Sequence, residues 1–214
     1  MAQRFIEKKN GREIWKLDGG RYRKATVWGE IRQKKEKISW HRLVWNPFVV
    51  PKHAVITWLA ILNRLPTVDR LKAWGIDKDG LCTLCKQEQE SRDHLFFECS
   101  YSKAVLKKVL QLCGLNREVL DWKREFAWAV QRIKGKTLIT RILKIGWNAY
   151  IYCIWKERNS KVFVQTEESA EQILEQIKIS VRFRLAGLRD VATNSINISL
   201  CRSWGLFDTC TKLK

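Results

Sequence analysis

The stretch "CTLCKQEQESRDHLFFEC", residues 82–99, holds three of the seven cysteines and one of the three histidines of this 214-residue chain. Cys82, Cys85, His94 and Cys99 follow the spacing C-x2-C-x8-H-x4-C. Cysteine and histidine are the ligands that zinc binds in tetrahedral structural sites, and two cysteines separated by two residues can turn both sulfurs onto one ion. Four protein ligands leave no coordination position for water, so we expect a structural zinc ion rather than a catalytic one.

The residues around this cluster fit a shielded metal site. Gly80 precedes the first cysteine and lets the backbone approach closely, and Leu95, Phe96 and Phe97 are expected to wall the ion from water. The alternative is a group of buried or redox-active thiols. A thioredoxin-like CxxC needs a strand before it and a helix after it in a βαβ unit, and this pattern is absent from the sequence.

The remaining cysteines and the N-terminus bear on the cellular compartment. An odd number of cysteines fits thiols and metal ligation better than a disulfide framework, and we expect Cys113 and Cys153 to be buried thiols. The opening "MAQRFIEKKNGREIW" has no apolar core of signal-peptide length. We therefore expect an intracellular protein of the nucleus or cytoplasm.

The charge of the chain predicts an anionic partner. Forty-one Lys and Arg against 22 Asp and Glu give a net charge of +19, more than solubility requires. Basic residues alternate with Trp, Tyr and Phe, which can stack on bases, and no apolar run approaches the length of a membrane span. RNA or single-stranded DNA is thus favoured over a membrane. The alternative is a solvated basic surface without a ligand.

Residues 1–39 are strongly basic and are expected to form a flexible arm, with short extended or irregular structure around Val27 and Ile31. Cations of this arm can follow a phosphate backbone, because each neutralised phosphate releases condensed counterions. The candidate nucleic-acid-binding residues are Arg21, Arg23, Lys24, Arg32, Lys34, Lys35 and Lys37. A tail solvated by its own charge is the alternative.

Beyond the arm, the apolar spacing predicts helices. In "PKHAVITWLAILNRL" the residues Val55, Trp58, Leu59 and Leu62 are spaced as one buried helical face. Further helices are expected in 67–75, 100–114, 121–133, 137–163 and 167–190, with 138–155 carrying a continuous apolar stripe and the final segment left unassigned. The predicted fold is mainly α, with an embedded CCHC zinc knuckle and a short irregular or β N-terminal arm.

The stretch from Trp40 to Cys99 resembles the zinc-binding domain at the C-terminal end of reverse transcriptases from plant LINE-type non-LTR retrotransposons. A Trp-rich entry, a "PK" turn into a helix, an "RLPT-x-DRL" segment, the C-x2-C knuckle and an "HLFF-x-C" close follow in this order. The later "IWKERNSKVF" is similar to the helix after the knuckle in these polyproteins. The resemblance covers roughly residues 28–165 and divides the chain into a basic arm (1–39), the zinc-binding domain (40–165) and a C-terminal helix and tail (166–214).

The resemblance implies a zinc-stabilised accessory module that binds RNA or single-stranded DNA, without polymerase activity of its own. The sequence has no "YxDD" polymerase motif, no endonuclease domain upstream and no ribonuclease H carboxylates; Asp77 and Asp79 are the closely spaced aspartates, in a turn. A protein-interaction or scaffold domain, co-opted from a retroelement or left as a non-functional remnant, is the alternative. A reverse transcriptase or another protein acting in trans is a further candidate partner.

Overall fold

The computed structural model describes residues 5–9, 12–16, 38–76, 79–188 and 191–206 in two units, Met1–Ile38 and Ser39–Lys214. In the first unit, strands β1 (Phe5–Lys9) and β2 (Arg12–Lys16) pair antiparallel, with Phe5 opposite Lys16. This hairpin agrees with the β option predicted for the arm. The seven candidate nucleic-acid-binding residues between 21 and 37, and the extended structure predicted near Val27 and Ile31, lie outside the described residues.

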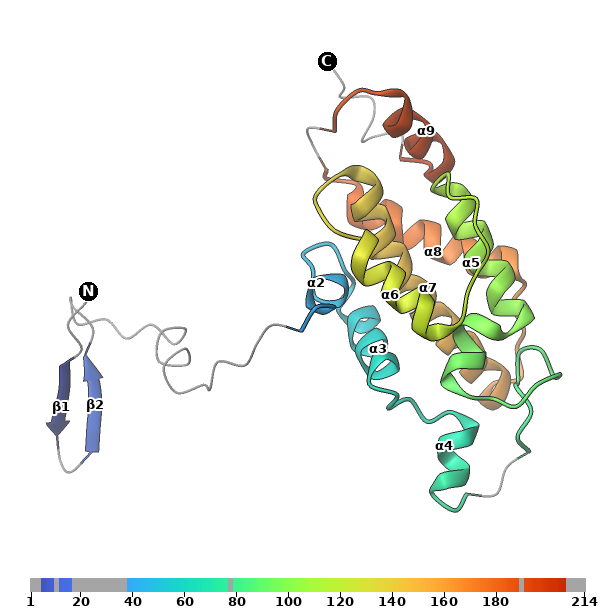
Figure 1. Cartoon of the computed structure of the whole chain (residues 1–214), viewed down its shortest axis with the longest axis horizontal. Helices are drawn as coiled ribbons and strands as arrows, with labels where there is room; N and C mark the ends of the chain where they lie inside the picture. The colour runs from blue at the N-terminus through green and yellow to red at the C-terminus, as the bar shows by residue number, and fades with distance from the viewer. Residues whose placement is uncertain (1–4, 10–11, 17–37, 77–78, 189–190, 207–214) are drawn as a thin grey trace. The chain divides into compact units, whose positions relative to one another are not determined.

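The second unit is helical and is built around its longest helix, α7 (Figure 1). α7 contacts α3 on one side and α8 on another, and α5 lies against α8. The helices are α2 (His41–Val44), α3 (Pro51–Ile61), α4 (Val68–Ala73), η1 (His94–Glu98), α5 (Ser100–Leu112), α6 (Trp122–Arg132), α7 (Leu138–Phe163), α8 (Ala170–Leu185) and α9 (Ser195–Trp204). The predicted mainly α fold is confirmed.

Local side-chain chemistry determines where several of these helices begin. The side chains of Asp121, Thr137 and Asn194 accept a hydrogen bond from the backbone N–H three residues later, at the starts of α6, α7 and α9. Ser169 and Gln172 form a reciprocal capping box at the start of α8. These bonds satisfy N–H groups that have no partner within the helix, which stabilises each start by about 1 kcal/mol.

Most of the predicted helix faces are buried as expected. On α8, all four residues at i, i+4, i+8 and i+12, from Ile173 to Leu185, are fully buried. α5 buries Val105, Leu106, Val109 and Leu110, followed by Cys113 at its end. The apolar stripe of α7 is likewise in the core, so helical periodicity identified the main packing surfaces.

The predicted buried face of α3 is wrong. Val55 and Leu62 are 42% and 38% exposed, whereas the buried residues of α3 are His53, Ala54, Thr57 and Ala60. α3 is apolar on nearly every side, so its periodicity does not single out one face. The smaller side chains face α7 because they allow a closer approach of the two helices, which improves packing.

The C-terminal segment left unassigned from the sequence contains α9. Trp204 of α9 is fully buried, and its indole N–H donates to the carbonyl of Leu112 at the end of α5. Its ring lies beside Gly146 of α7, where a Cβ atom would stand 3.8 Å away. α9 thus closes one end of the helical core, and the predicted boundary at residue 166 stays a prediction.

Burial changes the interpretation of the tryptophans. Trp122, Trp147, Trp155 and Trp204 are core residues, while Trp45 and Trp74 are exposed. Most described tryptophans therefore stabilise the fold, and few are left for stacking on bases. Within the described ranges, no helix is long and apolar enough to cross a membrane.

Candidate metal centre

The four predicted zinc ligands lie together in the structure. One ligand atom from each of Cys82, Cys85, His94 and Cys99 falls within 4.8 Å of all the others. The Sγ atoms of Cys82 and Cys99 are 4.0 Å apart, and the Sγ atom of Cys85 is 3.2 Å from Nε2 of His94. Residues separated by up to 17 positions in sequence thus form one cluster.

This donor set fits zinc in both chemistry and size. Three thiols and one imidazole form one of the standard tetrahedral ligand combinations. With Zn–S bonds of about 2.3 Å, tetrahedral geometry places two sulfurs about 3.8 Å apart and a sulfur and a nitrogen about 3.6 Å apart. The two measured separations are within a few tenths of an ångström of these values. The four ligands would complete the coordination shell, so the ion would be structural.

A π-helical turn positions His94 and Cys99. Five residues along an α-helix rotate the side chain by about 500°, which leaves the two side chains about 140° apart. In η1 the backbone closes the wider i→i+5 turn instead, and the N–H of Cys99 donates to the carbonyl of His94 at 2.7 Å. The x4 spacing between the two ligands is therefore accommodated by a local departure from α-helical geometry.

Side chains from other helices satisfy the backbone groups that this turn leaves without partners. Ser102 donates its hydroxyl to the carbonyl of Leu95 at 2.6 Å. Tyr150 of α7, fully buried, donates to the carbonyls of Phe96 and Ser102. Burial raises the pKa of Tyr150 well above its usual value, so the phenol keeps the proton that it donates.

A short antiparallel ribbon positions Cys82 and Cys85. Leu81 pairs with Gln89, the N–H of Glu90 donates to the carbonyl of Gly80, and the N–H of Cys82 donates to the carbonyl of Glu88. A Cβ atom at Gly80 would stand 1.9 Å from the side-chain oxygen of Gln89, so only glycine fits there without a shift. The close neighbour is the end of a flexible side chain, so the prediction that Gly80 allows a close approach of the backbone stays a prediction.

The electrostatics of the cluster favour thiolate at Cys99. A hydrogen bond from the Cys82 thiol lowers the pKa of Cys99 to about 5, assisted by the backbone N–H groups of Ser102 and Tyr101 and opposed by burial. Those two N–H groups belong to the first turn of α5, where the helix dipole favours negative charge. The hydrogen bond to Cys99, followed by burial, raises the pKa of Cys82.

A buried ion pair ties the knuckle to α7. The carboxylate of Glu90 accepts three hydrogen bonds from the guanidinium of Arg158, the shortest at 2.7 Å, and one from the backbone N–H of Val68. Both charged side chains are almost fully buried. Glu90 and Arg158 were not predicted from the sequence, because no local pattern shows that residues 68 positions apart meet.

The apolar wall of the site is confirmed. Leu95, Phe96 and Phe97 are fully buried, and the ring of Phe97 lies near those of Trp122, Trp147 and Tyr150. These rings separate the cluster from the solvent on the side of α6 and α7. A dry environment strengthens the attraction between a metal ion and its thiolate ligands.

The other cysteines divide into two kinds. Cys113 and Cys153 are buried free thiols, as predicted, and burial raises the pKa of each to about 12. Cys201 is disulfide-bonded, so the expectation of thiols throughout is wrong at this position. Its environment on α9 is separate from the metal cluster.

His53 is a buried core residue rather than a fifth ligand. Its ring stacks on that of Tyr152 with 4.3 Å between the ring centroids. Burial, followed by the neighbouring charge of Lys52, lowers its pKa to about 4. The imidazole is therefore neutral at pH 7 and serves packing.

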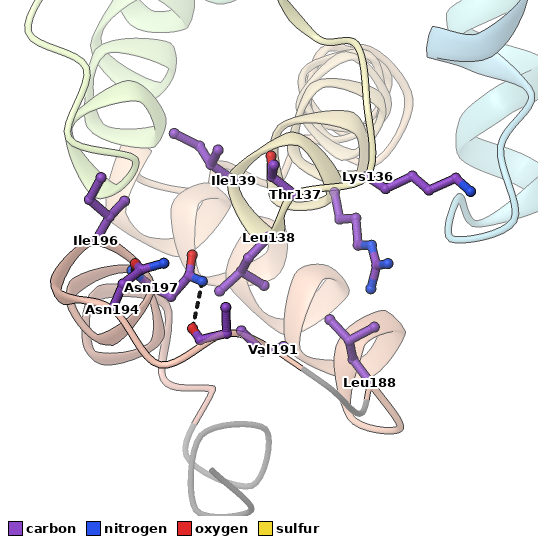
Figure 2. Close-up of a pocket in the computed structure, with 11 residues that line it drawn as sticks. Lys136, Thr137, Leu138, Ile139, Leu188, Val191, Asn194, Ile196 and Asn197 are labelled. Carbon is purple, nitrogen blue, oxygen red and sulfur yellow. Dashed lines mark hydrogen bonds between the residues drawn. The ribbon is translucent and has the colours of Figure 1, made fainter. Parts of the chain in front are cut away.

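A separate cavity of about 390 Å³ lies where α7 and α9 begin (Figure 2). Leu138, Leu188 and Val191 supply apolar lining, and Asn197 donates to the carbonyl of Ala192. In Figure 2 the side chain of Lys136 extends away from these apolar residues. The cavity lies at the end of α7 away from the metal cluster.

The segment that holds the metal cluster is similar to a known family of domains. Residues 22–105 match the family model described as zinc-binding in reverse transcriptase. A curated relative, described as an uncharacterized mitochondrial protein of Arabidopsis thaliana, is 34% identical over 73 residues. That match covers 33% of this chain and 51% of the relative, so the chain spans about half of the length of the relative. No solved structure matches the chain.

The family match and the geometry agree on the metal. The matched range contains all four residues of the cluster, and their donor atoms have the composition and the spacing that tetrahedral zinc requires. Residues 22–105 are thus similar to the family described as zinc-binding in reverse transcriptase, both in sequence and in holding a donor set that fits zinc.

Proposed function

We propose that this chain is a nucleic-acid-binding accessory module, stabilised by zinc bound to Cys82, Cys85, His94 and Cys99, and without polymerase activity of its own. The observation that carries the proposal is the net charge of +19 on a chain whose residues 22–105 match the model described as zinc-binding in reverse transcriptase. Such an excess of cations is expected of a protein that neutralises phosphates. RNA or single-stranded DNA is the proposed ligand, with a reverse transcriptase or another protein as a partner in trans.

The test is binding to a single-stranded oligonucleotide over a range of salt concentrations. If the arm residues contribute six phosphate contacts, the slope of log affinity against log salt is about −4, at about −0.7 per contact. Neutralising Arg21, Arg23, Lys24, Lys34, Lys35 and Lys37 together should flatten the slope, with fluorescence anisotropy as the readout. Failure of the unmodified chain to bind RNA and single-stranded DNA at 50 mM salt would exclude the proposal.

A protein-docking role is the second candidate, and one observation favours it. Ile179 and Phe183 lie one turn apart on α8 and are 54% and 74% exposed. Exposed apolar residues that share one helix face are typical of docking surfaces. Salt-insensitive recovery of one protein partner, lost on replacing Phe183 with Ser, would support this role over nucleic-acid binding.

The proposed absence of polymerase activity has a direct assay. Polymerisation needs carboxylates that hold two metal ions about 3.5 to 4 Å apart. In the sequence, Asp77 and Asp79 are the closely spaced aspartates, and Asp77 lies outside the described residues. Template-directed nucleotide incorporation that is lost in the Asp77→Asn, Asp79→Asn double variant would contradict the proposal. We also propose an intracellular location, in the nucleus or cytoplasm, because free and metal-binding thiols persist in reducing compartments.

A further inference from the structure

Three stretches of the chain without Asp or Glu meet at one end of α7. Residues 37–68, 126–156 and 176–188 contain no acidic residue. They supply α2 and α3, most of α7, and the second half of α8. α7 contacts α2, α3 and α8, so the cations of these stretches gather on one part of the helical unit.

Four of these cations form a connected group, the basic cluster, made of Arg42, Arg141, Lys144 and Arg184. The guanidinium of Arg141 lies over the ring of Phe48, 5.1 Å from its centroid, and Arg184 donates to the carbonyls of Phe48 and Pro47. Asn148 donates to the carbonyl of Lys144 at 2.8 Å and also to that of Leu43, the neighbour of Arg42, and Arg141 lies three residues before Lys144 on α7. Burial, followed by the charges of Arg42 and Arg141, lowers the pKa of Lys144. α2 is fixed against α7 by Asn148, which donates to the carbonyl of Leu43 at 2.9 Å.

No carboxylate compensates this cluster within the described part of the chain. None of its members forms an ion pair there, and the hydrogen bonds of Lys144 and Arg184 go to neutral carbonyls. Other cations of the described unit do have a Glu partner: Lys107, Lys108, Arg117, Arg158 and Lys161 outside the three stretches, and Lys156, Lys178 and Arg182 within them. Like charges held together without counter-charge repel one another, and an anionic ligand relieves the repulsion.

The surroundings of the cluster fit a nucleic-acid backbone better than a small anion. Lys136, exposed at the rim of the cavity in Figure 2, and Arg132 and Lys134 extend the cations along the connection between α6 and α7. Trp45, three residues after Arg42, is 40% exposed and can stack on a base. A strip of cations beside an exposed aromatic ring matches a strand of phosphates with attached bases.

We infer that Arg42, Arg141, Lys144 and Arg184, with Lys136, which lines the same cavity as Arg141, form a binding surface for the sugar–phosphate backbone of a single-stranded nucleic acid, and that Trp45 stacks on a base. The inference rests on the proposed nucleic-acid function and assigns part of it to the helical unit, separately from the N-terminal arm. In the sequence, this surface is indicated by the absence of acidic residues from the three stretches and not by a basic motif.

The test compares two triple variants of the full chain with the same loss of charge. Arg42→Gln, Arg141→Gln, Lys144→Gln removes the centre of the cluster, and Arg64→Gln, Lys103→Gln, Lys123→Gln removes three exposed cations with no ion pair in the described residues. Binding to a 20-nucleotide single-stranded RNA is measured by anisotropy from 50 to 400 mM salt. We expect the affinity of the cluster variant at 50 mM salt to fall at least about tenfold. Its slope of log affinity against log salt should become less negative by about 2, and the control variant should keep its slope.

The possible outcomes separate the inference from the proposed function. If the unmodified chain binds neither RNA nor single-stranded DNA, the proposed function fails; if it binds and both variants bind equally, the basic cluster is not the site. Should the triple variant fold poorly, Arg42→Gln, Lys136→Gln replaces it, because both side chains are exposed and make no hydrogen bond in the described residues.

A Trp45→Leu variant should weaken RNA binding but leave heparin binding unchanged, and equal loss for both would indicate a general polyanion surface. Equal affinity for DNA of the same length would show that the 2′-hydroxyl is not recognised.

Discussion

The two ends of α7 use charge in opposite ways. At the knuckle end, Arg158 is buried against Glu90 at 2.7 Å, beside a cluster of three cysteines and a histidine. At the other end, about 21 Å away along the helix, Lys144 lies among Arg42 and Arg141 without a carboxylate partner in the described residues. Paired, buried charge is part of the fold, whereas unpaired charge near the surface is available to a ligand.

The largest expected effect comes from removing two ligands at the knuckle end. Cys82→Ser, Cys99→Ser should abolish zinc binding and loosen residues 80–99, because a structural metal contributes its binding free energy to folding. The first turns of α7 should stay protected, since their partners α3 and α8 lie outside the knuckle. Metal analysis and amide hydrogen exchange measure the two outcomes.

A matched control for the ligand variant is Cys153→Ala, which removes a buried thiol outside the metal cluster. It should retain one zinc ion per chain. Two results would show that the two ends of α7 do not differ in their dependence on the metal. One is an unchanged zinc content in the double variant, and the other is an equal loss of amide protection along all of α7.

The second-largest effect is expected from removing one charge of the buried ion pair between Glu90 and Arg158. Glu90→Gln should lower the free energy of unfolding by about 3 to 5 kcal/mol, because removing one partner leaves the Arg158 charge buried without compensation. Urea denaturation measures the change. Glu118→Gln, which removes an exposed partner of Lys107, should cost less than about 1 kcal/mol.

The double variant Glu90→Gln, Arg158→Met sharpens this test. It removes both charges, so it should be less destabilised than Glu90→Gln alone, and the cycle gives the coupling between the two residues. Additive effects would mean that the ion pair does not tie the knuckle to α7.

The smallest effect is expected at the basic end. Arg42→Gln removes a like charge near Lys144, so the free energy of unfolding should stay unchanged or rise by a few tenths of a kcal/mol. Thermal unfolding at low and high salt measures it, and the difference from the unmodified chain should shrink as salt screens the charges. Clear destabilisation would mean that Arg42 has a structural role like that of Arg158.

Local patterns in the sequence were sufficient for the parts of the fold that depend on neighbouring residues. The four ligands and the buried faces of α5 and α8 all follow from short spacings. The face of α3 was misassigned because Val55 and Leu62 fit the same periodicity as Ala54 and Thr57, and only packing against α7 distinguishes them. The pairing of Glu90 with Arg158 depends on contacts across 68 positions, which no local pattern contains.

The hydroxyl of Tyr150 has a consequence for dividing this protein into fragments. A fragment that ends at residue 105 would contain the whole family match and all four metal ligands. It would lack the Tyr150 donor to the Phe96 carbonyl and the Arg158 partner of Glu90, and the rings of Phe96 and Phe97 would lose their cover. We therefore expect the smallest piece able to fold by itself to be longer than the family match and to extend at least through Arg158 of α7.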